Sequence, residues 1–400
     1  MKRLLPSFLF IFCLWIHLGF AHAQPSITPE QAIERVLGPG PVQPSWFDPA
    51  FLAQIPLAQI QQVVEQYTGQ NGKVQRVEKS DDGYTVYSEH AKFPAKAALN
   101  DQGQFTGLWF GLAQPLQAAS LEGSVKSFSQ LFGQVSVLVT EEGKPLASLN
   151  PDQPLGVGSA FKLAIIRALS SQIAAGKQHW DHVFLLNPAW KSLPSGVIRT
   201  WPDQTPLTLA TLANEMISIS DNTAADALLS IAGRENVEAV AARNRPFLST
   251  REAFILKDPA NEALLVRYRA ADAAGRRALL PQIDKLPLPD VAIFAQGKPL
   301  ATDIEWFFTA GELCSLIDGV RGLGAMQINP GLASKKEWLQ VAYKGGSEPG
   351  VLNFTTALTA KNGRHYCVAA TWNSEGVVDE NKFAKLYTGV LASLEAESAK

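Results

Sequence analysis

The 400-residue chain is poor in charged residues, and its two signs of charge almost balance. Charged residues make up 18% of the sequence, and 35 Lys and Arg stand against 37 Asp and Glu, a net charge of −2. Such a chain lacks the excess of positive charge on which nucleic-acid binding depends. We therefore expect no nucleic-acid partner. A hydrophobic content of 46% is instead typical of a globular protein with buried cores.

Long apolar runs are absent after the first 23 residues, so we expect no stable membrane anchor. Those 23 residues have the pattern of a secretory signal peptide: Lys2 and Arg3 precede the apolar run Phe8–Phe20, and Ala21-His22-Ala23 is a small-residue cleavage site. As a helix the run would rise about 20 Å, short of the roughly 30 Å hydrocarbon core of a bilayer. We expect cleavage after residue 23 and export to a bacterial periplasm.

Cysteine is scarce, and only Cys314 and Cys367 remain once the signal peptide is removed. Two cysteines in an exported protein can form one disulfide. However, Cys314 falls in a helical pattern and Cys367 in an apolar strand pattern, which favours two buried free thiols. The sequence leaves the pairing open, with free thiols as the favoured interpretation.

Metal-ligand patterns are equally sparse. The segment His179-Trp180-Asp181-His182 offers two imidazoles and a carboxylate, but no further ligands follow at metal spacing. We interpret these residues as loop polar groups and expect neither a metal nor another cofactor.

The hydrophobic pattern predicts a small α+β domain over residues 24–120. A helical pattern runs from Pro29 to Val64, and Asp81-Asp82-Gly83 and Asp101-Gln102-Gly103 are typical turns between strands. The expected strands are Lys73–Glu78, Tyr84–Ser88, Phe93–Leu99 and Phe105–Leu112. We find no nucleophile–base pair in this region and interpret it as a binding or packing module.

Residues 121–400 have strand patterns near both ends, a helical pattern between them and a last helix after the final strand. The expected strands are Gln134–Glu141, Pro145–Leu149, Leu339–Tyr343, Leu352–Thr359 and His365–Thr371, and a last helix is expected over Glu380–Glu397. This order predicts one sheet that joins the first and last strands of the segment, with helices packed on it.

Three short motifs in this second segment carry reactive side chains. In the first, Ser159 and Lys162 are three residues apart at the start of a predicted helix, so that an alcohol and an amine share one helix face. A neutral lysine can act as the base that activates an alcohol nucleophile. Taken alone, such a pair is better explained by a capping serine and a surface lysine.

The second motif is Ser220-Asp221-Asn222, between two helical segments, and the third is Lys344-Gly345-Gly346-Ser347, after a strand. Ser220 could pass a proton to a leaving group, and Asn222 could hold a substrate amide. The alternative is that Ser220 or Asp221 merely caps the next helix. Glycines in the third motif would let a substrate lie against the strand edge.

In this order the three motifs are the signature of serine β-lactamases and penicillin-binding proteins. From residue 124 onward the sequence resembles the class A β-lactamase family, most closely in Ser220–Asp226 and the following Leu228-Leu229. The resemblance implies an α+β fold: an antiparallel sheet with helices on both sides, plus a helical subdomain. The two-domain layout is similar to the clavulanate-cluster serine hydrolases, which implies a leading domain of the steroid-isomerase/cystatin type.

The resemblance also implies roles. Ser159 would be the acylated nucleophile and Lys162 its base or proton relay. Ser220 would deliver a proton to the leaving nitrogen, while Lys344 would lower the pKa of Ser220 and attract a substrate carboxylate.

Three further residues would bind the substrate. Asn222 would bind its side-chain amide, and Gly346 and Ser347 would lie along it at the strand edge. The backbone N–H groups of Ser159 and Ser347 would form the oxyanion hole, in which one donor is typically worth about 3–4 kcal/mol.

Two departures from the family pattern concern turnover. The family carries an E-x-E-L-N-like segment whose Glu activates the deacylating water, and here only Glu252 and Glu262 come near it, each equally explained as a solvated charge. Gly345 stands where the family prefers a hydroxyl residue that grips the β-lactam carboxylate, and Ser347 could compensate.

These observations predict an exported, monomeric serine hydrolase that acts on small-molecule β-lactams through an acyl-enzyme. An esterase or D,D-peptidase with poor β-lactam turnover is the alternative from the same chemistry. The alternative that is not an enzyme is a non-catalytic periplasmic binding protein with the same fold.

Overall fold

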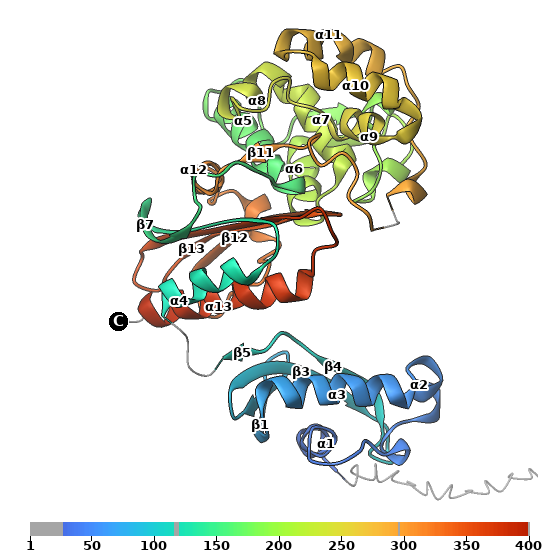
Figure 1. Ribbon diagram of the computed structural model, residues 1–400, viewed down its shortest axis with the longest axis vertical. Helices are drawn as coiled ribbons and strands as arrows, with labels where there is room; N and C mark the ends of the chain where they lie inside the picture. Colours follow the sequence, from blue (N-terminus) through green and yellow to red (C-terminus); the bar gives the residue numbers. More distant parts are fainter. Residues whose placement is uncertain (1–26, 116–119, 295–296, 399–400) are drawn as a thin grey trace, which may run out of the picture. The chain divides into compact units, whose positions relative to one another are not determined.

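The computed structural model describes residues 27–115, 120–294 and 297–398, and it divides into two compact units, Met1–Leu116 and Gln117–Lys400 (Figure 1). The sequence pattern placed this boundary after residue 120. No helix among the described residues is long and apolar enough to cross a membrane. The predicted signal peptide lies outside the described residues.

The first unit packs helices against an antiparallel meander. The helices are α1 (Pro29–Val36), α2 (Pro49–Gln54) and α3 (Leu57–Asn71), and the strands are β1 (Val74–Ser80), β2 (Gly83–Ser88), β3 (Ala91–Leu99), β4 (Phe105–Phe110) and β5 (Gln114–Pro115). The strand order is β1-β2-β3-β4, with β5 paired to β3. The expected mixture of helices and four strands is confirmed here, whereas the steroid-isomerase/cystatin likeness stays a prediction.

The second unit is built on one antiparallel sheet with the order β12-β13-β14-β6-β7 (Figure 1). Its strands are β6 (Gln134–Glu141), β7 (Lys144–Leu149), β12 (Gln340–Glu348), β13 (Val351–Thr359) and β14 (His365–Asn373). Pairing of β14 with β6 joins the two ends of the unit. This is the closure that the sequence pattern predicts, and β12 is left as an edge strand.

Helices cover both faces of this sheet. On one face lie α4 (Leu121–Lys126) and α13 (Glu380–Ser398), where the Tyr387 hydroxyl donates to Val368 O at 2.9 Å (Figure 1). On the other lies α12 (Ala310–Asp318), which packs between the sheet and α5 (Lys162–Ala174). Buried apolar side chains from α5, α12 and the sheet form one continuous core.

A helical subdomain follows α5. Its helices are α6 (Leu209–Ser218), α7 (Asn222–Ala232), α8 (Arg234–Val240), α9 (Thr250–Lys257), α10 (Glu262–Ala270) and α11 (Ala273–Ile283). Two small two-stranded sheets accompany them. In one, β8 (Leu155–Gly156) pairs with β11 (Phe307–Phe308), and in the other, β9 (Val183–Leu185) pairs with β10 (Pro206–Thr208). The break between α6 and α7 falls at residues 219–221, where the sequence predicts it. The antiparallel sheet, the helices on both faces and the helical subdomain are all confirmed.

The prediction of two free thiols is wrong, because Cys314 and Cys367 form a disulfide with their Cα atoms 5.8 Å apart. Cys314 lies on the face of α12 that packs against β14, the strand that carries Cys367. Helix and strand patterns of the sequence give no information about which helix covers which strand. The bond therefore depends on a tertiary contact that local patterns do not reveal.

Loss of this disulfide is expected to destabilise the second unit by about 2–4 kcal/mol, because the bond closes a loop of 53 residues in the unfolded chain. Urea unfolding of the Cys314→Ser/Cys367→Ser variant should show a lower midpoint than the oxidised wild type. Reduced wild-type protein serves as the control without substitutions. An unchanged midpoint in both samples would contradict the expectation.

Candidate active site

The first reactive pair lies where strand β8 turns into helix α5. A single 3-10 turn, η3 (Gly158–Phe161), precedes the helix, so the predicted helix start at Ser159 is instead a tighter turn. The turn still places Ser159 and Lys162 on one side, and Lys162 Nζ lies 3.1 Å from Ser159 Oγ. Ser159 is half-buried and open to a cavity, whereas the Lys162 side chain is fully buried.

Buried acceptors fix the Lys162 amine in place. Its Nζ lies 2.6 Å from the carbonyl oxygen of Ser220 and 2.7 Å from Asn222 Oδ1. Burial, and then the charge of Lys344, hold the pKa of Lys162 well below its ordinary value. A neutral amine has two N–H groups, which these acceptors use, and one lone pair. That lone pair is left to accept the proton of a nearby hydroxyl.

Ser220 places its hydroxyl between two lysines: its Oγ lies 3.0 Å from Lys162 Nζ and 3.1 Å from Lys344 Nζ. Burial lowers the pKa of Lys344 to about 7. Ser220 also has a φ of +61°, a left-handed conformation that is strained for a residue with a side chain. A hydroxyl shared by two low-pKa amines is a path along which a proton can move.

Asp221 supports this arrangement without facing the cavity. One carboxylate oxygen accepts from Ala224 N at 2.8 Å and caps α7, and the other accepts from Val197 N and Ile198 N at 2.6 and 2.8 Å. The capping alternative is therefore correct for Asp221. The Ser195 hydroxyl, which the sequence does not single out, donates a hydrogen bond to the Ser220 carbonyl oxygen.

Asn222 lies beside the reactive serines, but both ends of its amide already have partners. Its Oδ1 accepts from Lys162, and its Nδ2 donates to Leu193 O at 3.1 Å. The side chain is buried and lines the cavity. Its position therefore serves the lysine directly, and contact with a substrate amide stays a prediction.

Edge strand β12 approaches η3 through Gly346. A Cβ added to Gly346 would overlap the backbone of Val157 and Ser159, so a residue with a side chain would push the strand away. The sequence predicts that this strand ends at Tyr343, whereas it continues to Glu348. The close approach brings the backbone of Ser347 beside that of Ser159, as two oxyanion-hole donors require.

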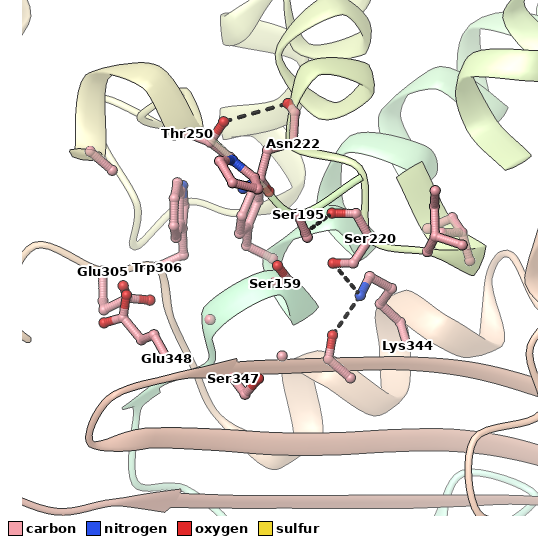
Figure 2. Close-up of a pocket in the computed structure, with 18 of the residues that line it drawn as sticks. Ser159, Ser195, Ser220, Asn222, Thr250, Glu305, Trp306, Lys344, Ser347 and Glu348 are labelled. Atoms are coloured by element: carbon pink, nitrogen blue, oxygen red, sulfur yellow. Dashed lines mark hydrogen bonds between the residues drawn. The ribbon is translucent and has the colours of Figure 1, made fainter. Parts of the chain in front are cut away.

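One cavity of about 480 Å³ is lined by Ser159, Ser220, Asn222, Lys344 and Ser347 (Figure 2). At one end are Ser220 and Lys344. Figure 2 shows Ser159 in the middle, with Glu305 and Glu348 on the opposite side from Lys344. Aromatic side chains line that second end: Phe161, Phe254, Phe294 and Trp306.

The sequence analysis missed this second end as a site, although Glu348 directly follows Ser347. Lys257, which lines the same end, directly follows the apolar run 253–256 at the end of α9. Lysine and glutamate are rarely buried in a core unless they are paired.

Neither Glu252 nor Glu262 lies at this cavity. The Glu252 side chain is buried, forms two hydrogen bonds with Arg234 at 2.7 and 2.9 Å, and accepts from Ser249 N at 2.7 Å. Glu262 is exposed in the first turn of α10. Glu252 therefore has a structural role at the start of α9, and the structure brings neither residue to Ser159.

Residues 115–272 match the family model described as "Beta-lactamase enzyme family". A β-lactamase structure from Sphaerobacter thermophilus is 17% identical with a TM-score of 0.50, over 71% of this chain and 98% of the other. A class A β-lactamase from Bacteroides cellulosilyticus is 18% identical with a TM-score of 0.46, over 70% of this chain and 99% of the other. The search of curated proteins found no match.

Proposed function

We propose that the second unit is a member of the family of serine β-lactamases and penicillin-binding-protein-like enzymes, and that the protein is an exported hydrolase that opens β-lactams through an acyl-enzyme on Ser159. The observation that carries the proposal is the placement of Lys162 Nζ within 3.1 Å of both Ser159 Oγ and Ser220 Oγ. One amine thus reaches the nucleophile and the group that would protonate the leaving nitrogen.

Acylation follows from these contacts. The lone pair of neutral Lys162 takes the proton of Ser159 as Ser159 Oγ attacks the substrate carbonyl carbon. The carbonyl π electrons move to oxygen, next to the backbone N–H groups of Ser159 and Ser347. The C–N bond then breaks, and the nitrogen takes a proton from Ser220, which Lys162 restores.

Gly345 favours a second candidate from the same chemistry. It offers no hydroxyl to a substrate carboxylate, so recognition of a β-lactam carboxylate falls on Lys344 and Ser347. An ester substrate without a carboxylate would not need that contact. We keep an esterase or D,D-peptidase activity as the alternative.

Intact-protein mass spectrometry with benzylpenicillin and a cephalosporin, beside a chromogenic β-lactam assay, tests the proposal. Rapid turnover supports a β-lactamase, and a lasting adduct on Ser159 supports the esterase or peptidase alternative. A nitrophenyl ester tests ester cleavage directly. If no substrate gives either an adduct or turnover, the acyl-enzyme proposal is wrong, and a binding protein with this fold becomes the better interpretation.

The low pKa of Lys344 gives a pH dependence. Because its pKa is about 7, Lys344 is charged below that pH and loses its proton above it. We expect kcat/KM for benzylpenicillin to fall about tenfold per pH unit above pH 7 as the carboxylate loses its cation. A neutral nitrophenyl ester is the control and should not show this fall. Equal profiles for the two substrates would show that Lys344 does not bind the carboxylate.

We also propose that the enzyme acts in the periplasm as a monomer. The proposal is supported by the signal-peptide pattern of residues 1–23. Expression of the full chain in a Gram-negative host should give a periplasmic protein whose first residue is Gln24. An uncleaved chain in the cytoplasmic fraction would contradict it.

A further inference from the structure

Three charged side chains from distant parts of the chain meet at the second end of the cavity. Lys257 ends α9, Glu305 precedes β11, and Glu348 ends β12. Lys257 Nζ donates to Glu305 Oε1 at 2.6 Å and to both oxygens of Glu348 at 2.7 Å. The exposed fractions of the three side chains are 3%, 1% and 22% in the same order. Glu348 is therefore the more exposed of the two carboxyl groups.

One ammonium faces two carboxyl groups here, so one negative charge is left uncompensated. Burial alone would lower the pKa of Lys257, but Glu305 and Glu348 reverse that effect and raise it, so Lys257 stays charged. Burial, together with Glu305 close by, holds the pKa of Glu348 well above its ordinary value. Two carboxyl groups that meet at one ammonium can share one proton between them.

An unused acceptor supports the shared proton. Glu305 Oε2 is buried and has no hydrogen-bond partner among the described residues. A buried acceptor without a donor is costly, and a proton on the neighbouring carboxyl group of Glu348 supplies one. The pair then consists of one carboxylic acid and one carboxylate. This is the state in which two paired carboxyl groups can accept a proton from water.

The pair also lies in the same cavity as Ser159, on the side opposite Lys344 (Figure 2). Alternate residues of a strand share a face, so Glu348 points to the same side of β12 as Gly346, which contacts the backbone of Ser159. Two residues of strand separate them, about 7 Å. On the other flank, Glu305 precedes Trp306, whose ring stacks on Phe161 at 3.8 Å. Both carboxyl groups line the cavity that contains Ser159 (Figure 2).

We propose that Glu305 and Glu348 are the general base that hydrolyses the acyl-enzyme, with Glu348 facing the water and Lys257 positioning both. The inference rests on the proposed acylation of Ser159. A water proton passes to Glu348 as the acid proton of Glu348 passes to Glu305; the water oxygen bonds to the acyl carbon and the carbonyl electrons move to oxygen. The C–Oγ bond then breaks, the proton passes to Ser159 Oγ, and the acid product leaves. No co-reactant other than water is needed.

The experiment separates formation of the adduct from its loss. Wild type, Glu348→Gln and Glu305→Gln are mixed with benzylpenicillin, and the Ser159 adduct is followed by rapid-quench mass spectrometry. Because a general base contributes about 10²–10⁴-fold, we expect both variants to form the adduct within threefold of the wild-type rate and to lose it at least 100-fold more slowly. Glu262→Gln, an exposed carboxylate on α10, is the control and should match the wild type.

Glu348→Asp, which keeps a carboxylate, should lose the adduct faster than Glu348→Gln. It also keeps the inference testable if Glu348→Gln fails to fold. If the glutamine variants lose the adduct at the wild-type rate, the inference is overturned, while the acyl-enzyme proposal stands. If wild-type protein forms no adduct and shows no turnover with any substrate, the proposed function fails and this inference fails with it. Equal slowing of formation and loss would indicate a structural role and overturn the inference.

Discussion

Replacement of Ser159 by alanine is expected to abolish the acyl-enzyme and to lower β-lactam or ester turnover by roughly 10⁴–10⁶-fold, the loss that follows removal of a serine nucleophile. Ser159 Oγ lies 3.1 Å from the Lys162 amine and opens to the cavity. The substitution removes one oxygen from a half-buried position, so the fold should be retained. Intact mass after incubation with benzylpenicillin, and steady-state turnover of a chromogenic substrate, measure the two effects.

Ser218→Ala is the matched control for this substitution. Ser218 lines the same cavity, but its hydroxyl donates to Asn214 O at 2.6 Å within its own helix and meets neither lysine. It should keep the adduct and most of the turnover. Ser159→Ala should still bind substrate, which calorimetry can detect. Persistence of the adduct in Ser159→Ala would move the nucleophile to another residue, with Ser220 as the first to examine.

The parts of the site that lie close together in the sequence could be predicted. Ser159 and Lys162 are one turn apart, and any helical turn brings them to one side. Asp221 is a helix cap, and its neighbours Ser220 and Asn222 are positioned by the same local geometry. Lys344 could be predicted only from the order of the three motifs, which resembles that of the family. No local rule connects Lys344 to Ser220, 124 residues away.

The carboxyl pair could not be predicted in this way. Lys257, Glu305 and Glu348 are joined only because α9, the segment before β11 and the end of β12 pack around one cavity end. The family pattern points to Glu252 and Glu262, which lie elsewhere. The disulfide was missed for the same reason, since it joins a helix to the strand beneath it.

The length of β12 shows a third limit. Consecutive glycines weaken a strand pattern, so the sequence predicts an end at Tyr343. In the structure the strand continues because its backbone stays paired with β13 as far as Glu348, and Gly346 leaves room for η3. A local rule thus failed where the chain approaches the nucleophile, because close packing outweighed strand propensity.

Replacement of Lys162 by methionine is expected to slow acylation by about 10³–10⁴-fold with β-lactams and with nitrophenyl esters alike, since a positioned base contributes about that much. Methionine occupies a similar volume but has no amine, so Ser159 loses the lone pair that accepts its proton. Burst-phase acylation rates measured with both substrates give the size of the effect. Circular dichroism confirms that the variant is folded.

Ser220→Ala separates the two roles assigned to the Lys162 amine. A nitrophenolate leaves without a proton, whereas a β-lactam nitrogen needs one, so loss of Ser220 should slow β-lactam acylation far more than ester acylation. Lys162→Met should slow both, because activation of Ser159 precedes the departure of either leaving group. If Lys162→Met instead affected only the β-lactam, the amine would serve the leaving group alone. Another group would then have to remove the proton from Ser159, and the short Nζ–Oγ contact would have only a structural role.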